Sequence, residues 1–144
     1  MFEETVEKRL ETWLEFRKKL EKSSNPLQEV WDFWNQAPFI PYNRYIDHYY
    51  QNAWPSPWEI IAKNKYDDFT KALMIGWTLK ITKRFNESDI FLQTAVDISS
   101  QREYNLVYVD NSWVINYSDN GPVDIKNLPD SFKVENLIEL TTPR

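Results

Sequence analysis

The side chains able to do chemistry in this chain are carboxylates and one histidine. Cysteine is absent, and His48 is the single histidine. Thiol nucleophiles, disulfides and thiolate or multi-histidine metal centres are therefore excluded, and we expect neither a metal nor a cofactor. Hydrolysis of a glycosidic bond would instead need two facing carboxylates, one of them with a raised pKa. The carboxylates available for such a pair are Asp47, Glu59, Asp67 and Asp68.

Asp67 and Asp68 stand where a long apolar segment begins. A carboxylate near a helix N-terminus is stabilised in its charged form as a cap and by the helix dipole, whereas a general acid needs a raised pKa. We therefore expect these two residues to cap a helix and Asp47 to be a solvated surface group. The sequence shows no serine or aspartate partner for His48. A carboxylate-dependent hydrolase acting on glycan or peptidoglycan stays open as the alternative function.

Composition and charge exclude several other functions. The 144 residues include two glycines, too few for a phosphate-binding glycine loop. The net charge is −5, which disfavours broad binding of nucleic acid. The charged segment 1–13 is unlike a signal peptide, and no apolar run is long enough to cross a membrane. We expect a cytoplasmic protein that is not secreted by a signal peptide and does not bind membranes.

The first half of the chain has helical spacing of its apolar residues. The segment 3–22 is amphipathic, and it either packs on the domain or protrudes as an arm that contacts another chain. The segment 66–83 is apolar on nearly every side, which is typical of a central, buried helix. Gly76 lies inside it, so we expect close packing against another element there. Further helices are predicted over 26–36 (with Asn25 as its N-cap), 42–50 and 57–63.

The second half changes from helical spacing to alternation. A strand is predicted over 90–96, and a hairpin over 104–109 and 113–117 turns around 110–112. A turn at 120–122 and a last apolar segment at 137–140 follow. Helices first and strands later favour one α+β domain over 1–144, with N-terminal helices and the central helix packed on a small antiparallel sheet.

The segment 41–80 contains two motifs, Trp-Pro-Ser-Pro-Trp-Glu at 54–59 and Tyr-Asp-Asp-Phe-Thr-Lys-Ala at 66–72. Together with 104–118, it resembles the transglutaminase-like or papain-like cysteine proteinases. In the family, a Trp-x-x-Pro-x-Glu stretch precedes Gly-Asp-Cys-Glu-Asp-Tyr-Ala at the start of a buried helix. A following hairpin carries the histidine and the acid. The resemblance implies a helix N-terminus that lowers the pKa of a thiol, and a strand histidine that activates it.

The family's catalytic residues are missing at the matching positions. The cysteine's place falls on Tyr66, the histidine's place on Tyr104 or Asn105, and the acid's place on Asn116. A phenol and two amides cannot perform thiolate acyl transfer at neutral pH. The resemblance therefore implies a degenerate site at Tyr66, Asn105 and Asn116, on a scaffold that is no longer an enzyme.

Residues 54–79 are also similar to small proteins encoded by T4-like tailed phages, which implies a virion or assembly component. Ten aromatic residues lie within 31–58, and aromatic side chains are enriched at protein interfaces. We therefore predict a non-catalytic structural or interaction protein, in the host cytoplasm and in the virion. Its partners would be other virion proteins or copies of itself. The predicted contact residues are Tyr49, Tyr50, Trp54, Trp58 and Asp68.

Overall fold

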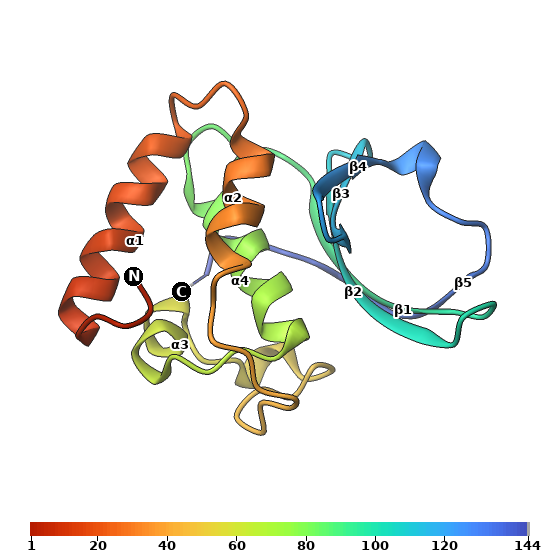
Figure 1. Ribbon diagram of the computed structural model, residues 1–144, viewed down its shortest axis with the longest axis horizontal. Coiled ribbons are helices and arrows are strands. Elements are labelled where there is room, and N and C mark those ends of the chain that lie inside the picture. Colours follow the sequence, from red (N-terminus) through yellow and green to blue (C-terminus); the bar gives the residue numbers. More distant parts are fainter. Residues whose placement is uncertain (144) are drawn as a thin grey trace.

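A computed structural model describes residues 1–143 and has the predicted α+β class. Helices gather on one side of the molecule and a curved antiparallel sheet on the other (Figure 1). The α-helices are α1 (Val6–Leu20), α2 (Pro26–Trp34), α3 (Pro57–Lys63) and α4 (Asp68–Ile81), with short 3-10 turns at Gln51–Ala53 and Ile125–Asn127. The strands are β1 (Ile90–Asp97), β2 (Arg102–Val109), β3 (Trp113–Ser118), β4 (Gly121–Asp124) and β5 (Phe132–Glu139).

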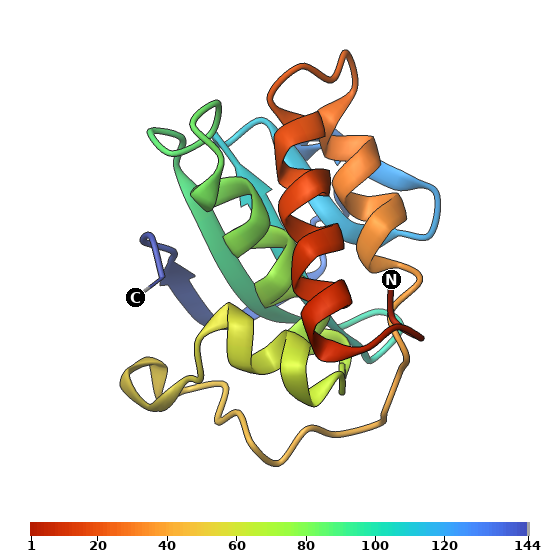
Figure 2. The same ribbon diagram turned by 90° about the vertical axis from the view of Figure 1, so that its left-hand side faces the viewer.

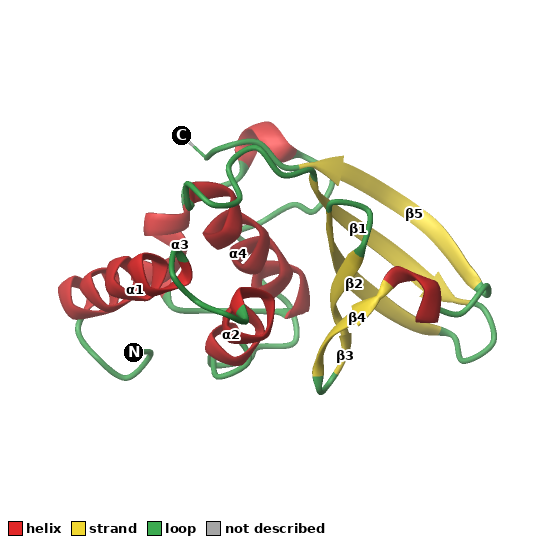
Figure 3. Cartoon of the chain, turned by 90° about the horizontal axis from the view of Figure 1, so that it is seen from above, coloured by secondary structure: helices red, strands yellow, loops and turns green. Residues whose placement is uncertain are grey.

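The sheet has the order β4-β3-β2-β1-β5, and every neighbouring pair is antiparallel. One face packs on the helices, and α4 lies against β1 and β2 while α2 lies against β3 and β4. Seen from above, the strands curve away from the helical layer, with β5 at the outer edge (Figure 3). A small second core on the other face is built around Tyr104, Leu106 and Val114.

The central helix α4 is buried on nearly all sides, as its sequence predicts. A methyl group added at Gly76 would collide with the Cδ1 atom of Leu140, so the expected close packing is confirmed. The fully buried hydroxyl of Thr78 accepts hydrogen bonds from two indoles, those of Trp13 (3.1 Å) and Trp34 (3.0 Å). This single hydroxyl therefore links α1, α2 and α4 inside the core.

Helix α1 packs on the domain and does not extend away from it. Trp13 and Leu20 are fully buried, and Phe16 stacks on Phe33 of α2 at a ring distance of 4.1 Å. Buried Arg9 donates to the carbonyl oxygens of Ile61 and the neighbouring residue at the end of α3. These bonds satisfy carbonyls that the end of a helix leaves free. No helix within residues 1–143 has the length and apolar character needed to cross a membrane.

One local prediction is wrong. The segment 42–50 forms turns, because the side chains of Asn43 and Asp47 accept hydrogen bonds from the backbone N–H groups of Tyr45 and Tyr49. Such bonds compete with helical ones. Asn25 is the N-cap residue of α2, as predicted, but its side chain makes no capping hydrogen bond.

The last strand is longer than the apolar segment 137–140 that the sequence indicated. Its start is tied to the β1–β2 turn through Asp97, whose carboxylate accepts from the hydroxyls of Ser131 (2.6 Å) and Ser99 (2.7 Å). These hydrogen bonds lower the pKa of Asp97 to about 2. The C-terminal strand is therefore held to the sheet at both its backbone and this carboxylate.

Candidate functional site

The site begins at the N-terminus of α4. Asp67 is the N-cap, and its Oδ1 atom accepts from the backbone N–H (2.7 Å) and hydroxyl (2.5 Å) of Thr70. The other oxygen accepts from the backbone N–H of Asn43 at 3.1 Å. Asp68 is the first helical residue and points away from these bonds toward the sheet, where its carboxylate meets β2 and β3. The two adjacent aspartates thus have different roles.

Asn105 of β2 supplies the first partner of Asp68. Its Nδ2 atom donates to Asp68 Oδ2 at 2.9 Å, and the side chain is 7 % exposed. Thr94 lies directly opposite on β1, and its hydroxyl donates to Asn105 Oδ1 at 3.2 Å. Because Oδ1 accepts from Thr94, the amide group is oriented with its N–H donors toward Asp68. Tyr104 faces the second core, so Asn105 is the residue of this pair at the site.

Asn116 of β3 supplies the second partner. Its Nδ2 atom donates to Asp68 Oδ1 at 3.2 Å and to the backbone oxygen of Asn105 at 2.8 Å. Asn116 has φ 75°, a left-handed conformation that asparagine tolerates better than most residues, and the β3–β4 register shifts here. Ile115 already faces the helices, so regular alternation would turn Asn116 to the opposite face. The irregularity re-aims its side chain at Asp68, as bulges beside functional sites often do.

The structure therefore brings together two of the three predicted site residues, Asn105 and Asn116. The third residue at the site is Asp68 and not Tyr66. Tyr66 lies two residues before α4, and its ring packs against Phe2 (5.6 Å) and Trp34 (5.6 Å) in the helical core. Its buried hydroxyl has no hydrogen-bond partner within residues 1–143, and burial raises the pKa of this phenol. The prediction that Tyr66 faces Asn105 and Asn116 is wrong. Asp68 occupies that place, because the capping residue sets where the helix starts.

A cleft of about 310 Å³ opens in front of this cluster. The residues that line it include Trp31, Tyr42 and Tyr104, together with the cations Lys71 and Arg102. The ammonium group of Lys71 lies 4.7 Å from the centre of the Trp31 ring. Burial lowers the pKa of Lys71, and the carboxylates of Asp68 and a nearby surface aspartate act against that change. The cleft is thus aromatic, polar and of mixed charge.

His48 also reaches the cleft, although the sequence suggested no partner for it. Its ring stacks on Phe69 at 4.0 Å, and its Nε2 atom lies 3.5 Å from Asp67 Oδ2. Burial favours the neutral acid form of Asp67, but the nearby imidazole of His48 and hydrogen bonds from Thr70 and the Asn43 backbone outweigh it and lower the pKa of Asp67. His48 therefore lies against the cap of α4, although its Nε2 atom makes no hydrogen bond within residues 1–143.

The four aromatic residues predicted as contacts divide into two kinds. Tyr49 and Tyr50 are exposed, at 62 % and 60 %. Trp58 is 39 % exposed, and one edge of its ring packs on Trp13. Trp54 is partly buried and donates from its indole to the Asp47 carbonyl at 2.6 Å, so it mainly holds the loop in place. The predicted contact residue Asp68 lies inside the cleft and is engaged by the two amides.

Sequence reasoning missed Lys71, Arg102 and Thr94. A signal for Lys71 existed, since it lies three residues after Asp68 and therefore shares its helix face. Thr94 and Arg102 depend on strand register, which the sequence did not provide. Within residues 1–143, no group of three or more acidic or histidine side chains is arranged to hold a metal ion. No protein-family model and no curated protein sequence matches the chain.

Proposed function

We propose that this protein is a non-catalytic interaction protein on a degenerate transglutaminase-like scaffold. The observation that carries the proposal is the arrangement of Asp68, Asn105 and Asn116. A residue at the N-terminus of a buried helix meets one side chain from each of two adjacent strands. This is the order in which the resembling proteinases present their cysteine, histidine and acid. Each of the three positions here holds a side chain unsuited to that chemistry.

Acyl transfer requires a proton movement that these side chains do not support. A thiol protease needs a nucleophile and a base that takes its proton. An amide such as that of Asn105 does not accept a proton at neutral pH, and its donor already points at Asp68. Both oxygens of Asp68 accept hydrogen bonds from amides. These hydrogen bonds therefore join α4 to β2 and β3, and we call the cluster of Asp68, Asn105 and Asn116 the latch.

The carboxylate hydrolase is less well supported. Asp67 has its two oxygens occupied by backbone and hydroxyl donors, and its pKa is lowered, which is unsuited to a general acid. Glu59 is exposed on α3, and its backbone N–H donates to the Ser56 cap. Asp47 accepts from the Tyr49 backbone in a surface turn. Among the four candidates, Asp67 and Asp47 thus have local hydrogen-bond partners, and Glu59 is exposed.

Exposed aromatic side chains support an interaction function. Large exposed apolar groups mark contact surfaces when they gather in one region. Phe39, Tyr42, Tyr45, Tyr49 and Tyr50 are 45–69 % exposed and belong to the segment between α2 and α3. A virion or assembly component of a tailed phage is the setting that fits the sequence resemblance, with virion proteins or copies of the chain as partners.

A hydrolysis assay tests the non-catalytic part of the proposal. The wild-type protein and Asp68→Asn are incubated with peptidoglycan suspensions and with nitrophenyl glycosides between pH 4 and 8. We expect no turnover above buffer for either protein. Hydrolysis by the wild type that disappears in Asp68→Asn would overturn the proposal in favour of the carboxylate enzyme. A melting curve of each protein confirms that the compared samples are folded.

A further inference from the structure

Three cations converge on one exposed tyrosine, Tyr45. Tyr45 is 45 % exposed, and the Nζ atoms of Lys63 and Lys65 lie 4.2 Å and 5.8 Å from its ring centre. The guanidinium of Arg44 lies 5.5 Å from the same centre. We propose that these four residues, the Tyr45 patch, bind a short acidic segment of a partner protein. The proposal rests on the proposed interaction function and names the chemistry of the partner.

Within the described residues 1–143, the cations of the Tyr45 patch have no acidic partner. Acidic residues outnumber lysine and arginine by 22 to 17 in the sequence. Nevertheless, within residues 1–143 no carboxylate lies within 4.0 Å of Arg44, Lys63 or Lys65. Arg44, together with Lys65 and Lys63, lowers the pKa of Tyr45, as expected where positive charge accumulates. Local charge is thus opposite in sign to the net charge of −5.

The backbone under the patch is fixed before any partner binds. Buried Asn43 donates from Nδ2 to the carbonyl of Lys65 at 3.2 Å, and its Oδ1 accepts from the backbone of Tyr45 at 3.1 Å. Ile46, next along the chain, is 1 % exposed and anchors the segment in the core. Rigid presentation reduces the ordering cost of binding. The segment between α2 and α3, which carries the exposed aromatic residues, runs along one end of the molecule (Figure 2).

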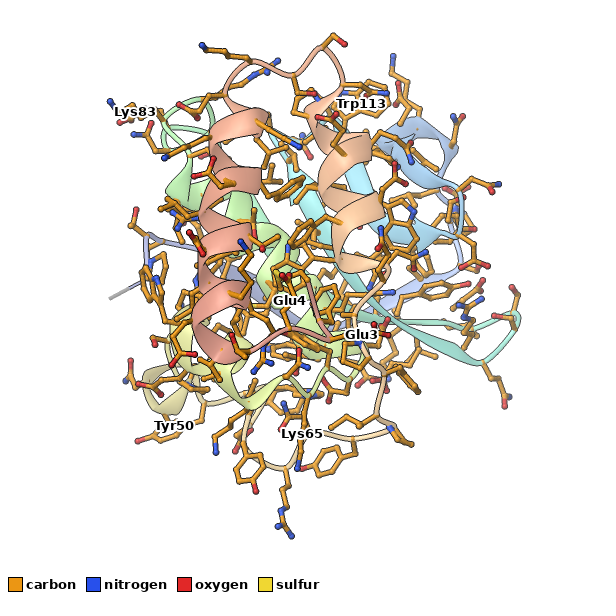
Figure 4. The ribbon with its side chains drawn as sticks, turned by 60° about the vertical axis from the view of Figure 1, so that its left-hand side comes forward. Glu3, Glu4, Tyr50, Lys65, Lys83 and Trp113 are labelled. Carbon is orange, nitrogen blue, oxygen red and sulfur yellow. The ribbon has the colours of Figure 1, made fainter. Side chains whose placement is uncertain are left out.

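Apolar surface adjoins the cations. Phe39 is 69 % exposed, and its backbone bridges to Tyr66, the residue after Lys65. Tyr42 is 67 % exposed and forms part of the cleft wall. Lys65 and Tyr50 lie at the same end of the molecule, away from Trp113 and Lys83 (Figure 4). Aromatic and arginine side chains together are typical of the centre of a protein interface.

An acidic peptide fits this surface better than a nucleic acid strand. A strand carries phosphates beyond the three cations and would continue over a surface of net negative charge, which repels it. A short segment with a few aspartates or glutamates places its carboxylates on Arg44, Lys63 and Lys65 alone. Its apolar side chains would rest on Phe39 and Tyr42. Because the patch holds three cations, it suits a short acidic peptide better than a nucleic acid strand.

Titration of the isotope-labelled full chain, followed by amide NMR shifts, tests the proposal. The probes are acetylated and amidated hexaglutamate, hexaglutamine of the same length, and oligothymidylate of six nucleotides. The variant Lys63→Gln/Lys65→Gln removes two of the three cations. The matched control Lys18→Gln/Lys133→Gln removes two exposed lysines from α1 and β5.

We expect hexaglutamate to shift the amides of 43–46 and 63–66, and hexaglutamine to leave them unchanged. Binding should weaken about tenfold in Lys63→Gln/Lys65→Gln and stay within twofold in the control, because exposed ion pairs each contribute modestly. Shifts that are absent, or equal in both variants, would overturn the proposal. Tighter binding of oligothymidylate would overturn it in favour of nucleic acid. Neither result bears on hydrolysis, so the non-catalytic part of the proposed function is tested separately by the hydrolysis assay.

Discussion

Replacing Asp68 by alanine removes the latch between α4 and the sheet. The change deletes two hydrogen bonds, from Asn105 at 2.9 Å and from Asn116 at 3.2 Å. Bonds to a charged acceptor each contribute about 1.5–3 kcal/mol, and the partial exposure of Asp68 reduces this. Asn116 keeps its bond to the Asn105 carbonyl, whereas the Asn105 amide is left without that acceptor. We therefore expect a loss of about 2–4 kcal/mol in the free energy of unfolding.

Urea unfolding and thermal melting measure this loss. A chain of this size loses about 3–4 °C per kcal/mol, so the melting temperature of Asp68→Ala should fall by about 10 °C. Asp119→Ala is the matched control, because Asp119 is exposed at the same cleft and should change stability by less than about 0.5 kcal/mol. If Asp68→Ala were as stable as Asp119→Ala, the reasoning about the latch would be refuted.

Three further predictions concern the core and the sheet. Thr78→Val should cost about 2–4 kcal/mol in urea unfolding, because the buried indoles of Trp13 and Trp34 lose their shared acceptor; an unchanged midpoint would contradict this. Tyr66→Phe should stabilise the protein by about 1 kcal/mol, since it removes a buried hydroxyl without a partner; a marked loss would reveal a bond to that hydroxyl. The lowered pKa of Asp97 predicts stability that is present above its unfolded value of 3.8 and lost as pH falls toward about 2. Asp97→Asn should flatten this part of the stability–pH curve, and an unaltered curve would count against it.

The fold class and the central helix could be predicted because their signals are local. The apolar spacing over 66–83 indicated α4, which spans Asp68–Ile81. The segment 42–50 could not be recognised as turns, since its aromatic spacing suits a helix. Its outcome depends on Asn43 and Asp47 capturing backbone N–H groups. Such competition between side chain and backbone is decided by tertiary contacts, here the bond of Asn43 to Asp67.

The candidate site was predicted in part for similar reasons. Asn105 and Asn116 were placed by the resemblance to the cysteine proteinases, and both reach the N-terminus of α4. Asn116 does so through a left-handed residue and a register shift, which sequence alternation does not contain. The third position was misplaced from Asp68 to Tyr66. That difference of two residues depends on which aspartate caps the helix, a choice fixed by Thr70 and Asn43.

The most direct test of the degenerate-site claim installs the missing chemistry. Asp68→Cys, Asn105→His and Asn116→Asp are combined, and the rate of iodoacetamide alkylation at pH 6 is compared with that of Asp68→Cys alone. A drop of about two units in the thiol pKa strongly raises the fraction of thiolate at pH 6, while it lowers the nucleophilicity of that thiolate. The net effect is an alkylation rate about tenfold higher. Asp68→Cys with Asn105→His alone is measured in parallel, should the triple variant fold poorly.

Glu59→Cys is the control, because Glu59 lies in the first turn of α3 and also feels a helix N-terminus. We expect Asn105→His and Asn116→Asp to raise the alkylation rate of Asp68→Cys about tenfold. The same two substitutions should leave the alkylation rate of Glu59→Cys unchanged. Equal rates with and without the histidine and acid, in folded variants, would contradict the claim that these three positions form a lost Cys-His-Asp site.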